Sequence, residues 1–401
     1  MDHGPAPEMA EAPAAVAPAE RPAVAQVAEA ADMAEMVVLA LDIGATQIRA
    51  AAILPDGTRL GRRAAPTPVA AGAAAIYQAC AELLSGVADG LPAEVRRRVA
   101  AIGIASMGPV DPWRGLVVDP PNVPSLRDAP LADEMEARLG LPAFLDRDTN
   151  VAALAESWLG AARGCRDFLY VTVSTGLGGA VVHDGRLMLG PDGTAGELGH
   201  VTLMMDGGPR CGCGGAGHLE GIAAGAGLAA QAQEEAARGG SAFLSARADL
   251  APLTARDVAE GELAGDRACK MLMERARRAF AVASVGWVNA FNPELIVVGG
   301  TLAERQGERW LGAARAAVES SAFRAPAARV RIVPPQLGDD VGLVGAWPLV
   351  AQRRGDPAWR EKRPGHSLVN GSGSHAAPDA AAPDAAAPDA AARAAQAARG
   401  D

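Results

Sequence analysis

Two short glycine-containing turns, each between two apolar segments, constrain the fold of this chain more than any other feature. The first interrupts VVLALDIGATQIRAAAI at residues 42–47, and the second interrupts FLYVTVSTGLGGAVV at residues 174–179. A strand follows each turn where a P-loop or a Rossmann fingerprint would continue into a helix, so both of those nucleotide sites are excluded. Two strand–turn–strand units about 130 residues apart predict a duplicated α/β fold that holds a nucleotide between its halves.

Both turns carry the groups that bind phosphate. Glycine lets a ligand approach the backbone closely, and peptide N–H and hydroxyl groups can face phosphate oxygens. Asp42 is placed to hold a magnesium ion through water. The first turn by itself also fits an ordinary hairpin. Together the two turns predict nucleotide contacts at Asp42, Gly44, Thr46, Ser174, Thr175, Gly176 and Gly178.

Residues 196–220, GELGHVTLMMDGGPRCGCGGAGHLE, predict a metal site. Nitrogen and sulfur donors in this number suit tetrahedral zinc, and the intervening glycines let the loop fold back on itself. The alternative is a surface turn with two idle thiols, which is less favoured because histidines flank the Cys-x-Cys pair on both sides. Glu197 and Glu220 lie just outside the ligands, where rigid carboxylates suit a polyol. The predicted ligands are His200, Cys211, Cys213 and His218.

A polar turn in FLDRDTNVAALAE joins a strand end to a helix start, a common place for catalytic residues. Asp148 in this turn has two possible roles. It can act in catalysis, or it can cap the helix that follows. Without its neighbours, the turn favours the cap slightly.

The metal segment resembles the signature of the ROK family (repressors, open reading frames and sugar kinases). The family's Gly-x-x-Gly-x-Ala-Gly-Glu-x-Gly-His run matches residues 190–200, and its Cys-x-Cys-Gly-x-x-Gly-Cys-x-Glu run matches residues 211–220. His218 replaces the usual third cysteine, so two imidazoles and two thiolates would hold the zinc. The two turns are similar to the phosphate motifs of the actin-like ATPase and sugar kinase superfamily, although Ala45 and Ser174 stand where glycine is common. In that superfamily a strand with a glycine pair faces the adenosine, which implies nucleotide contacts at Gly299 and Gly300 at the end of FNPELIVVGG, a sequence that by itself also fits an ordinary turn.

This resemblance implies a catalytic residue and a sugar site. The family's Asn-Asp-x-Asn motif matches residues 147–150, which makes Asp148 the general base that accepts the proton of a sugar hydroxyl. Arg147 replaces the asparagine that binds sugar hydroxyls, and arginine cannot accept a hydrogen bond. It either points elsewhere or signals a changed or anionic substrate, and we expect its charge to lower the pKa of Asp148. The implied sugar contacts are Glu197, His200 and Glu220, with Gly108, Asn122 and Asn150 as additions.

The implied architecture is a two-domain α/β, actin-like (ribonuclease H-like) fold with an interdomain cleft. We expect a small domain over residues 37–150, completed by a helix at 340–353, and a large domain over 151–336 with the zinc loop. Residues 1–36 are rich in alanine and proline, and residues 354–401 include AAPDAAAPDAAAPDAA. Such sequences bury little apolar surface, so both ends are predicted to be disordered tails.

The resemblance implies an ATP- and Mg²⁺-dependent hexokinase, with glucose phosphorylated at its 6-hydroxyl as the leading reaction. Fructose, mannose, N-acetylglucosamine and N-acetylmannosamine are alternative substrates. Two other classes stay open: a sugar-sensing ROK regulator, disfavoured because the alanine- and proline-rich N-terminus does not suit a winged helix, and a catalytically weak sugar-binding protein.

Charge and hydropathy limit the partners and location of the protein. A net charge of −10 without a stripe of basic residues argues against nucleic acid. No apolar run reaches membrane-spanning length and no signal peptide is visible, so we expect a cytoplasmic protein without a membrane partner. Relatives of this kind suggest a homo-oligomer, either a dimer or a tetramer.

Overall fold

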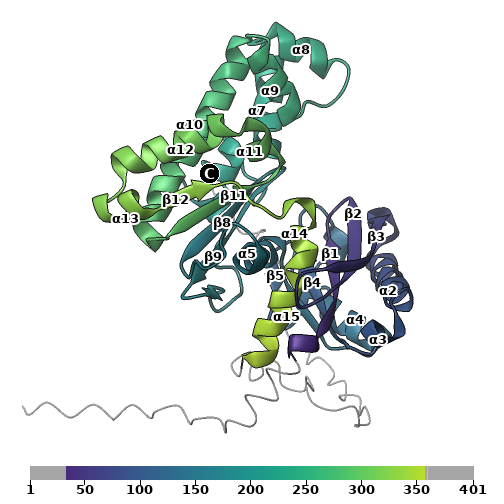
Figure 1. Cartoon of the computed structure of the whole chain (residues 1–401). Coiled ribbons are helices and arrows are strands. Elements are labelled where there is room, and N and C mark those ends of the chain that lie inside the picture. Colours follow the sequence, from purple (N-terminus) through teal and green to yellow (C-terminus); the bar gives the residue numbers. More distant parts are fainter. Residues whose placement is uncertain (1–32, 357–358, 360–401) are drawn as a thin grey trace, which may run out of the picture. The chain divides into compact units, whose positions relative to one another are not determined.

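The computed structural model describes residues 33–356 and residue 359. Most of the two predicted tails, residues 1–36 and 354–401, therefore lies outside the described residues. Two five-stranded sheets, each with helices packed against it, form the described part of the chain (Figure 1).

The first sheet has the strand order β3-β2-β1-β4-β7. Its central strand β1 is buried at all seven positions, as expected for the apolar run VVLALDI. The hairpin strands pair antiparallel on one side of β1, whereas the other neighbours pair parallel. The strands are β1 (Val37–Ile43), β2 (Gln47–Ile53), β3 (Arg59–Pro66), β4 (Val99–Ser106) and β7 (Ala143–Arg147).

The second sheet repeats this pattern with the order β10-β9-β8-β11-β12. Again a hairpin lies on one side of the central strand, and two parallel strands lie on the other. Its strands are β8 (Phe168–Val173), β9 (Leu177–His183), β10 (Arg186–Leu187), β11 (Leu295–Gly299) and β12 (Arg331–Val333), and a separate small hairpin pairs β5 (Val110–Asp111) with β6 (Leu116–Val117). The two sheets therefore confirm the predicted duplication.

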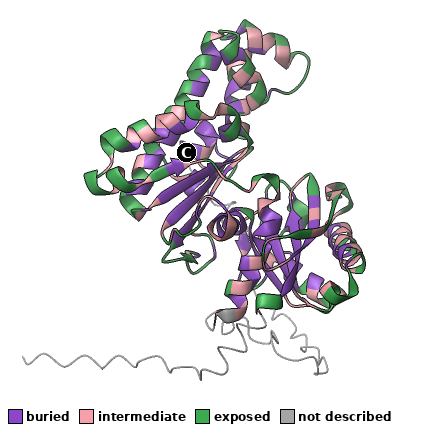
Figure 2. Cartoon of the chain, viewed as in Figure 1, coloured by how far each residue is buried: buried purple, intermediate pink, exposed green. Residues whose placement is uncertain are grey.

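Helices cover both sheets, and their inward faces are buried while their outward faces are exposed (Figure 2). In the first half of the chain they are η1 (Val69–Ala71), α2 (Ala73–Asp89), α3 (Ala93–Arg96), η2 (Pro124–Leu126), α4 (Leu131–Leu139) and α5 (Asp148–Leu159). In the second half they are η3 (Leu198–His200), α6 (Leu219–Ala223), α7 (Gly225–Ala237), α8 (Ala242–Ala248), α9 (Ala255–Leu263), α10 (Arg267–Phe291), α11 (Thr301–Gln306), α12 (Glu308–Ser321) and α13 (Arg324–Arg329). None of the described helices is long and apolar enough to cross a membrane.

The helix predicted at residues 340–353 is divided into several pieces. A turn of 3-10 helix, η4 (Gly338–Asp340), leads into α14 (Val341–Val344), and α15 (Ala346–Gly355) follows. A Cβ at Gly345, between the last two helices, would lie 1.9 Å from the carbonyl oxygen of Val151, so the chain passes α5 more closely than any other residue type allows. Helices α14 and α15 contact both α5 and β1, which places residues 341–355 against the first sheet.

Candidate functional site

The first predicted phosphate turn is a tight hairpin between β1 and β2. The Gly44 N–H group donates to the carbonyl oxygen of Gln47 at 2.9 Å. Thr67, just after β3, braces the turn because its hydroxyl group donates to the carbonyl oxygen of Gly44 at 2.7 Å. Thr46 is left exposed at the tip of the turn, where its hydroxyl group is accessible to a ligand.

Asp42 is buried near the end of β1, and its carboxylate already has a partner. Arg49 lies opposite Asp42 in the hairpin register, and its guanidinium group pairs with Oδ2 of Asp42. Burial raises the pKa of Asp42, and the positive charge of Arg49 opposes that rise. Sequence reasoning missed Arg49, although counting antiparallel register back from the turn would have placed it across from Asp42.

The second predicted phosphate turn, between β8 and β9, faces a cavity of about 1120 Å³. The turn is closed by the Ser174 N–H group, which donates to the carbonyl oxygen of Gly176 at 2.9 Å. Ser174 and Thr175 line the cavity together with residues of α7, α9 and α11. A cavity of this size is large enough for a nucleotide.

The predicted glycine pair at residues 299 and 300 lies directly beside this turn. Gly300 has φ +93°, and a Cβ there would lie 2.5 Å from the carbonyl oxygen of Val173, the residue that leads into the turn. Only glycine accepts both that backbone conformation and that approach. The pair therefore lets α11 start against the second phosphate turn.

Arg256, Arg305 and Arg309 also line the cavity, and sequence reasoning identified none of them. Arg309 forms an ion pair with the buried Glu262. No short motif marks these arginines. Only the packing of α9, α11 and α12 near the second turn brings them to the cavity.

Asp148 is the first residue of α5, directly after β7. Its Oδ1 accepts a hydrogen bond from the N–H group of Thr149 at 2.7 Å, whereas Arg147 holds the N-cap position, so the helix-capping role considered for Asp148 is not the one seen. Asp148 is exposed to solvent, but many protein atoms lie close to its carboxyl group and reduce its hydration.

This surrounding protein desolvates the Asp148 carboxyl group and raises its pKa to about 6. Asp42 and Glu197 push the pKa further upward by repulsion, while the Thr149 hydrogen bond and Arg147 oppose the rise. We expected Arg147 to lower the pKa of Asp148. The charge of Arg147 does act in that direction, but desolvation outweighs it, so the pKa of Asp148 is raised on balance.

Arg147 points away from solvent and is only 3% exposed. Its guanidinium group forms an ion pair with Oε1 of Glu197 and donates to the carbonyl oxygen of Ala195. Its aliphatic stem packs against Gly108, where a Cβ would lie 3.1 Å from Cδ of Arg147. Its Nε atom is buried and has no hydrogen-bond partner among the described residues. Arg147 thus joins two predicted sugar contacts, Glu197 and Gly108.

The two predicted asparagine contacts differ in position. Asn150 is buried, and its amide donates to Asp146 at 2.7 Å and accepts from Arg147 at 3.4 Å, so both of its polar groups have protein partners. Asn150 therefore helps to hold the guanidinium group of Arg147 in place. Asn122 is exposed in the loop before η2, and no hydrogen bond in the described part of the chain joins it to the other candidate residues.

The four predicted metal ligands come together as expected. The ligating atoms of His200, Cys211, Cys213 and His218 all lie within 4.8 Å of one another. Nδ1 of His200 is 3.5 Å from Sγ of Cys211, and Nδ1 of His218 is 3.3 Å from Sγ of Cys213. Tetrahedral zinc, with bonds of about 2.3 Å to sulfur and about 2.0 Å to nitrogen, separates such atoms by roughly 3.5 Å. The four side chains therefore fit this ion.

Both predicted sugar-binding glutamates lie beside this cluster. Oε2 of Glu197 is 3.7 Å from Nε2 of His200, the ring nitrogen that faces away from Cys211. Oε1 of Glu220 is 3.2 Å from Sγ of Cys211. Asp148, Arg147, Glu197, His200 and the cluster thus form one continuous chain of polar neighbours.

Comparison with known proteins finds one family over most of the chain. The ROK family model matches residues 38–353. Glucokinase from Thermotoga maritima is 32% identical over 324 residues, which is 80% of this chain and all of that protein. N-acetylmannosamine kinase from Escherichia fergusonii is 34% identical over 317 residues, covering 79% of this chain and 99% of that protein.

Solved structures give the same result. The ROK family glucokinase from Streptomyces griseus, in complex with glucose and AMPPNP, superposes with a TM-score of 0.64 at 30% sequence identity. The match covers 79% of this chain and 99% of that one. Together with the two matching sheets, it confirms the predicted actin-like α/β fold class.

Proposed function

The chain belongs to the ROK family, and on that basis we propose that it transfers the γ-phosphate of ATP to the 6-hydroxyl group of a hexose, with glucose as the leading substrate. The Asp148 carboxyl group carries this proposal, because it begins α5 next to Thr149, which packs against the second turn, and because desolvation, with smaller contributions from Asp42 and Glu197, raises its pKa to about 6. A carboxylate with this pKa is ionised at neutral pH and is still basic enough to accept a proton. The protein is thus an ATP-dependent sugar kinase with Asp148 as its general base.

Phosphoryl transfer depends mainly on positioning and on charge stabilisation. The N–H group of Thr149 holds one oxygen of Asp148, which leaves the other oxygen to accept a hydrogen bond from the sugar hydroxyl group. The base then orients the attacking oxygen and takes its proton as the new O–P bond forms and the bond to the leaving ADP breaks. Asp148 sits where it can do this because it starts α5 beside the second turn, with the methyl group of Thr149 packed against Gly178.

The nucleotide is assigned to the two turns and the adjoining cavity. Backbone N–H groups and the hydroxyl groups of Thr46, Ser174 and Thr175 are the phosphate donors, and the 1120 Å³ cavity beside the second turn is wide enough for the adenosine. Mg²⁺ neutralises charge on the transferred phosphate when it is bound. Asp42 is the residue that would hold it, through the carboxylate oxygen that Arg49 does not engage.

The sugar is assigned to Glu197, His200 and Glu220, with Gly108 and Asn122 as further contacts and Asn150 behind them. Arg147 changes the hydrogen-bonding balance of this site, since it takes up Oε1 of Glu197 and brings only donors. A site with fewer acceptors recognises fewer hydroxyl groups and suits a substrate with an extra acceptor, such as an N-acetyl carbonyl group. Glucose has the support of the glucokinase relatives, and N-acetylmannosamine is the second candidate.

Zinc is the ion we propose for the cluster of two histidines and two cysteines. The fit of the N···S separations to tetrahedral zinc supports this choice. Zinc would brace the loop and orient His200, whose other ring nitrogen faces Glu197. A metal-free protein with normal stability and activity would refute the assignment, and metal analysis of the wild type and of His218→Ala tests it.

A coupled assay of ADP release across a hexose panel tests the proposed function. The panel contains glucose, mannose, fructose, N-acetylglucosamine and N-acetylmannosamine, with Asp148→Asn as the control. We expect the highest kcat/KM with glucose and near-background turnover in the variant. Sugar binding without turnover of any hexose would favour the alternative of a regulator or a catalytically weak binding protein. Homo-oligomerisation and a cytoplasmic location stay predictions from the sequence.

A further inference from the structure

The second phosphate turn, residues 174–179, is hydrogen-bonded to residues 220–226, the segment that directly follows the metal ligands. The carbonyl oxygens of Ser174 and Thr175 accept hydrogen bonds from the N–H groups of Gly225 and Ala226, each at 2.8 Å. The N–H group of Leu177 donates to Oε2 of Glu220 at 2.9 Å. Three hydrogen bonds from residues 220–226 therefore hold the backbone of this turn.

Glu220 also depends on the metal cluster. His218 is the N-cap residue of α6, and Glu220 is the second residue of that helix, so the position of one ligand sets the start of the helix that carries the carboxylate. The other carboxylate oxygen, Oε1, lies 3.2 Å from Sγ of Cys211. One side chain therefore contacts a metal ligand with one oxygen and the phosphate turn with the other.

The packing around this contact leaves little room for Glu220 to move on its own. A Cβ at Gly176 would lie 2.9 Å from Oε2 of Glu220, and a Cβ at Gly225 would lie 2.8 Å from the carbonyl oxygen of Ser174. A Cβ at Gly221 would lie 2.8 Å from the carbonyl oxygen of Arg210, next to Cys211. Closely packed groups transmit displacements to their neighbours, so a shift of the cluster reaches the turn.

We propose that Glu220 couples the metal cluster to the second phosphate turn, so that metal occupancy changes the affinity for the nucleotide. This inference rests on the proposed use of the turn as a phosphate site. Coupling between two binding sites is reciprocal. Nucleotide binding must therefore raise the affinity of the cluster for zinc by the same factor.

The experiment measures both directions on the full chain. Calorimetric titration with the ATP analogue AMPPNP and Mg²⁺ compares zinc-loaded protein with metal-free protein, and competition with a zinc-selective chromophoric chelator measures zinc affinity with and without AMPPNP. We expect the AMPPNP affinity to fall about tenfold on metal removal, and the zinc affinity to rise about tenfold with AMPPNP. Equal AMPPNP affinities in folded protein with and without zinc would overturn the proposal.

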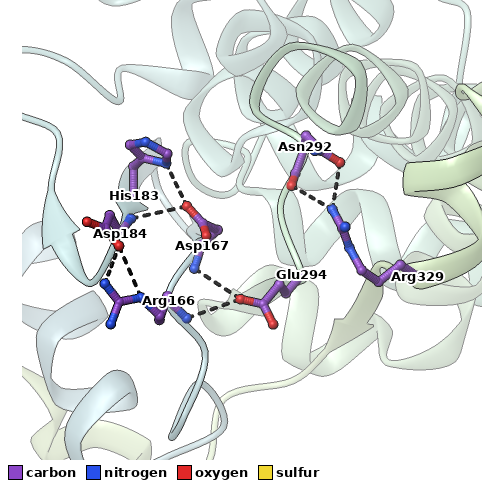
Figure 3. A network of polar contacts seen from close by, with 7 residues as sticks. All are labelled: Arg166, Asp167, His183, Asp184, Asn292, Glu294 and Arg329. Carbon is purple, nitrogen blue, oxygen red and sulfur yellow. Dashed lines mark hydrogen bonds and ion pairs between the residues drawn. The ribbon is translucent and has the colours of Figure 1, made fainter.

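Two variants separate coupling from general damage. In Glu220→Ala, zinc-loaded protein should bind AMPPNP as weakly as metal-free wild type. The matched control is Asp167→Ala at the opposite end of β9, where the Asp167 carboxylate accepts from the N–H group of Asp184 at 3.1 Å and contacts His183 (Figure 3). Both substitutions remove a carboxylate that holds the backbone at one end of β9, but only Glu220 touches the cluster. The control should keep wild-type AMPPNP affinity within about twofold and the full response to zinc.

A third variant keeps the proposal testable if Glu220→Ala does not fold. If melting curves show that Glu220→Ala is unfolded, Glu220→Gln tests the same contacts, because its amide has one acceptor for the two partners. Its AMPPNP affinity must then respond to zinc less than that of wild type, and an undiminished response overturns the role of Glu220. The coupling is measured by binding alone, so a protein that shows it but phosphorylates no sugar would sink the proposed reaction and leave the coupling standing.

Discussion

The two phosphate turns occupy equivalent places in two sheets of the same topology, but they are held by different means. The first turn carries an acid, Asp42, which its own hairpin pairs with Arg49. The second turn carries hydroxyl groups, and residues 220–226, just beyond the metal ligands, hold it in place. The repeated fold thus places two similar turns at equivalent positions, and the residues around each turn give it a different function. We infer that the first turn binds Mg²⁺ through Asp42, while the second turn binds and positions the phosphate groups of the nucleotide.

Asp148 is repelled by the charge of Asp42 in the first turn and directly precedes Thr149, which packs against Gly178 of the second turn. Removing the charge of Asp148 should have the largest effect. Asp148→Asn should lower kcat by about 10²–10⁴-fold, because a positioned general base contributes on that scale. AMPPNP binding should stay close to that of wild type, since neither turn loses a contact. Steady-state kinetics together with calorimetry check both parts. Substantial turnover in this variant would mean that Asp148 is not the base.

The contrast between the turns is tested by a pair of variants. Asp42→Asn removes the acid of the first turn, and Thr175→Ala removes a hydroxyl group from the second. We expect kcat to fall roughly 10–100-fold in the first variant, with a raised Mg²⁺ requirement, because charge at the transferred phosphate matters most in the transition state. The second variant should mainly raise KM for ATP, by less than about tenfold. If both variants lost the same activity and required the same Mg²⁺ concentration as each other, the two turns would not differ in function.

Arg147 should affect the sugar side and neither turn. Arg147→Ala removes the ion pair that holds Glu197, so KM for the sugar should rise about tenfold, as expected for a hydrogen bond to a charged group. KM for ATP should stay nearly constant. Arg147→Lys serves as the control that keeps the charge and loses the fork of donors. A parallel rise in both KM values would show that Arg147 supports the whole fold and not the sugar site.

The smallest expected effect is on stability. The pKa of Asp148 in the folded protein is about 6 and its ordinary value is 3.8, so the folded state binds the proton more tightly than the unfolded chain does. Ionising Asp148 above pH 6 therefore destabilises the fold, and this penalty fades as the pH falls toward 4. Asp148→Asn should unfold with a free energy higher by about 1 kcal/mol at pH 7.5, after allowance for solvent screening.

The difference in stability between this variant and wild type should shrink toward zero near pH 4. Urea unfolding at several pH values measures it. A gap that stays constant with pH would show that the raised pKa of Asp148 does not destabilise the fold.

Local sequence was sufficient for the parts of the site that lie within one short segment. The apolar runs around residues 42–47 and 174–179 specified two hairpins, and the Cys-x-Cys loop specified four candidate metal ligands whose donor atoms lie within 4.8 Å of one another. These features depend on alternation, turn residues and donor chemistry over a few neighbouring positions. The sequence also placed Asp148 at a strand–helix junction, where the structure has it.

Contacts between segments far apart in the chain were decided only by the tertiary structure. The pKa of Asp148 depends on desolvation by packed neighbours, and that outweighed the adjacent arginine whose effect the sequence predicted. Arg147 turned inward to Glu197, 50 residues away, and Glu220 reached Leu177, 43 residues away. Such pairings follow from how sheets and helices pack, which no short window of sequence records. The sequence by itself therefore determined the fold and the chemical groups of the site, and the packing decided which of those groups touch.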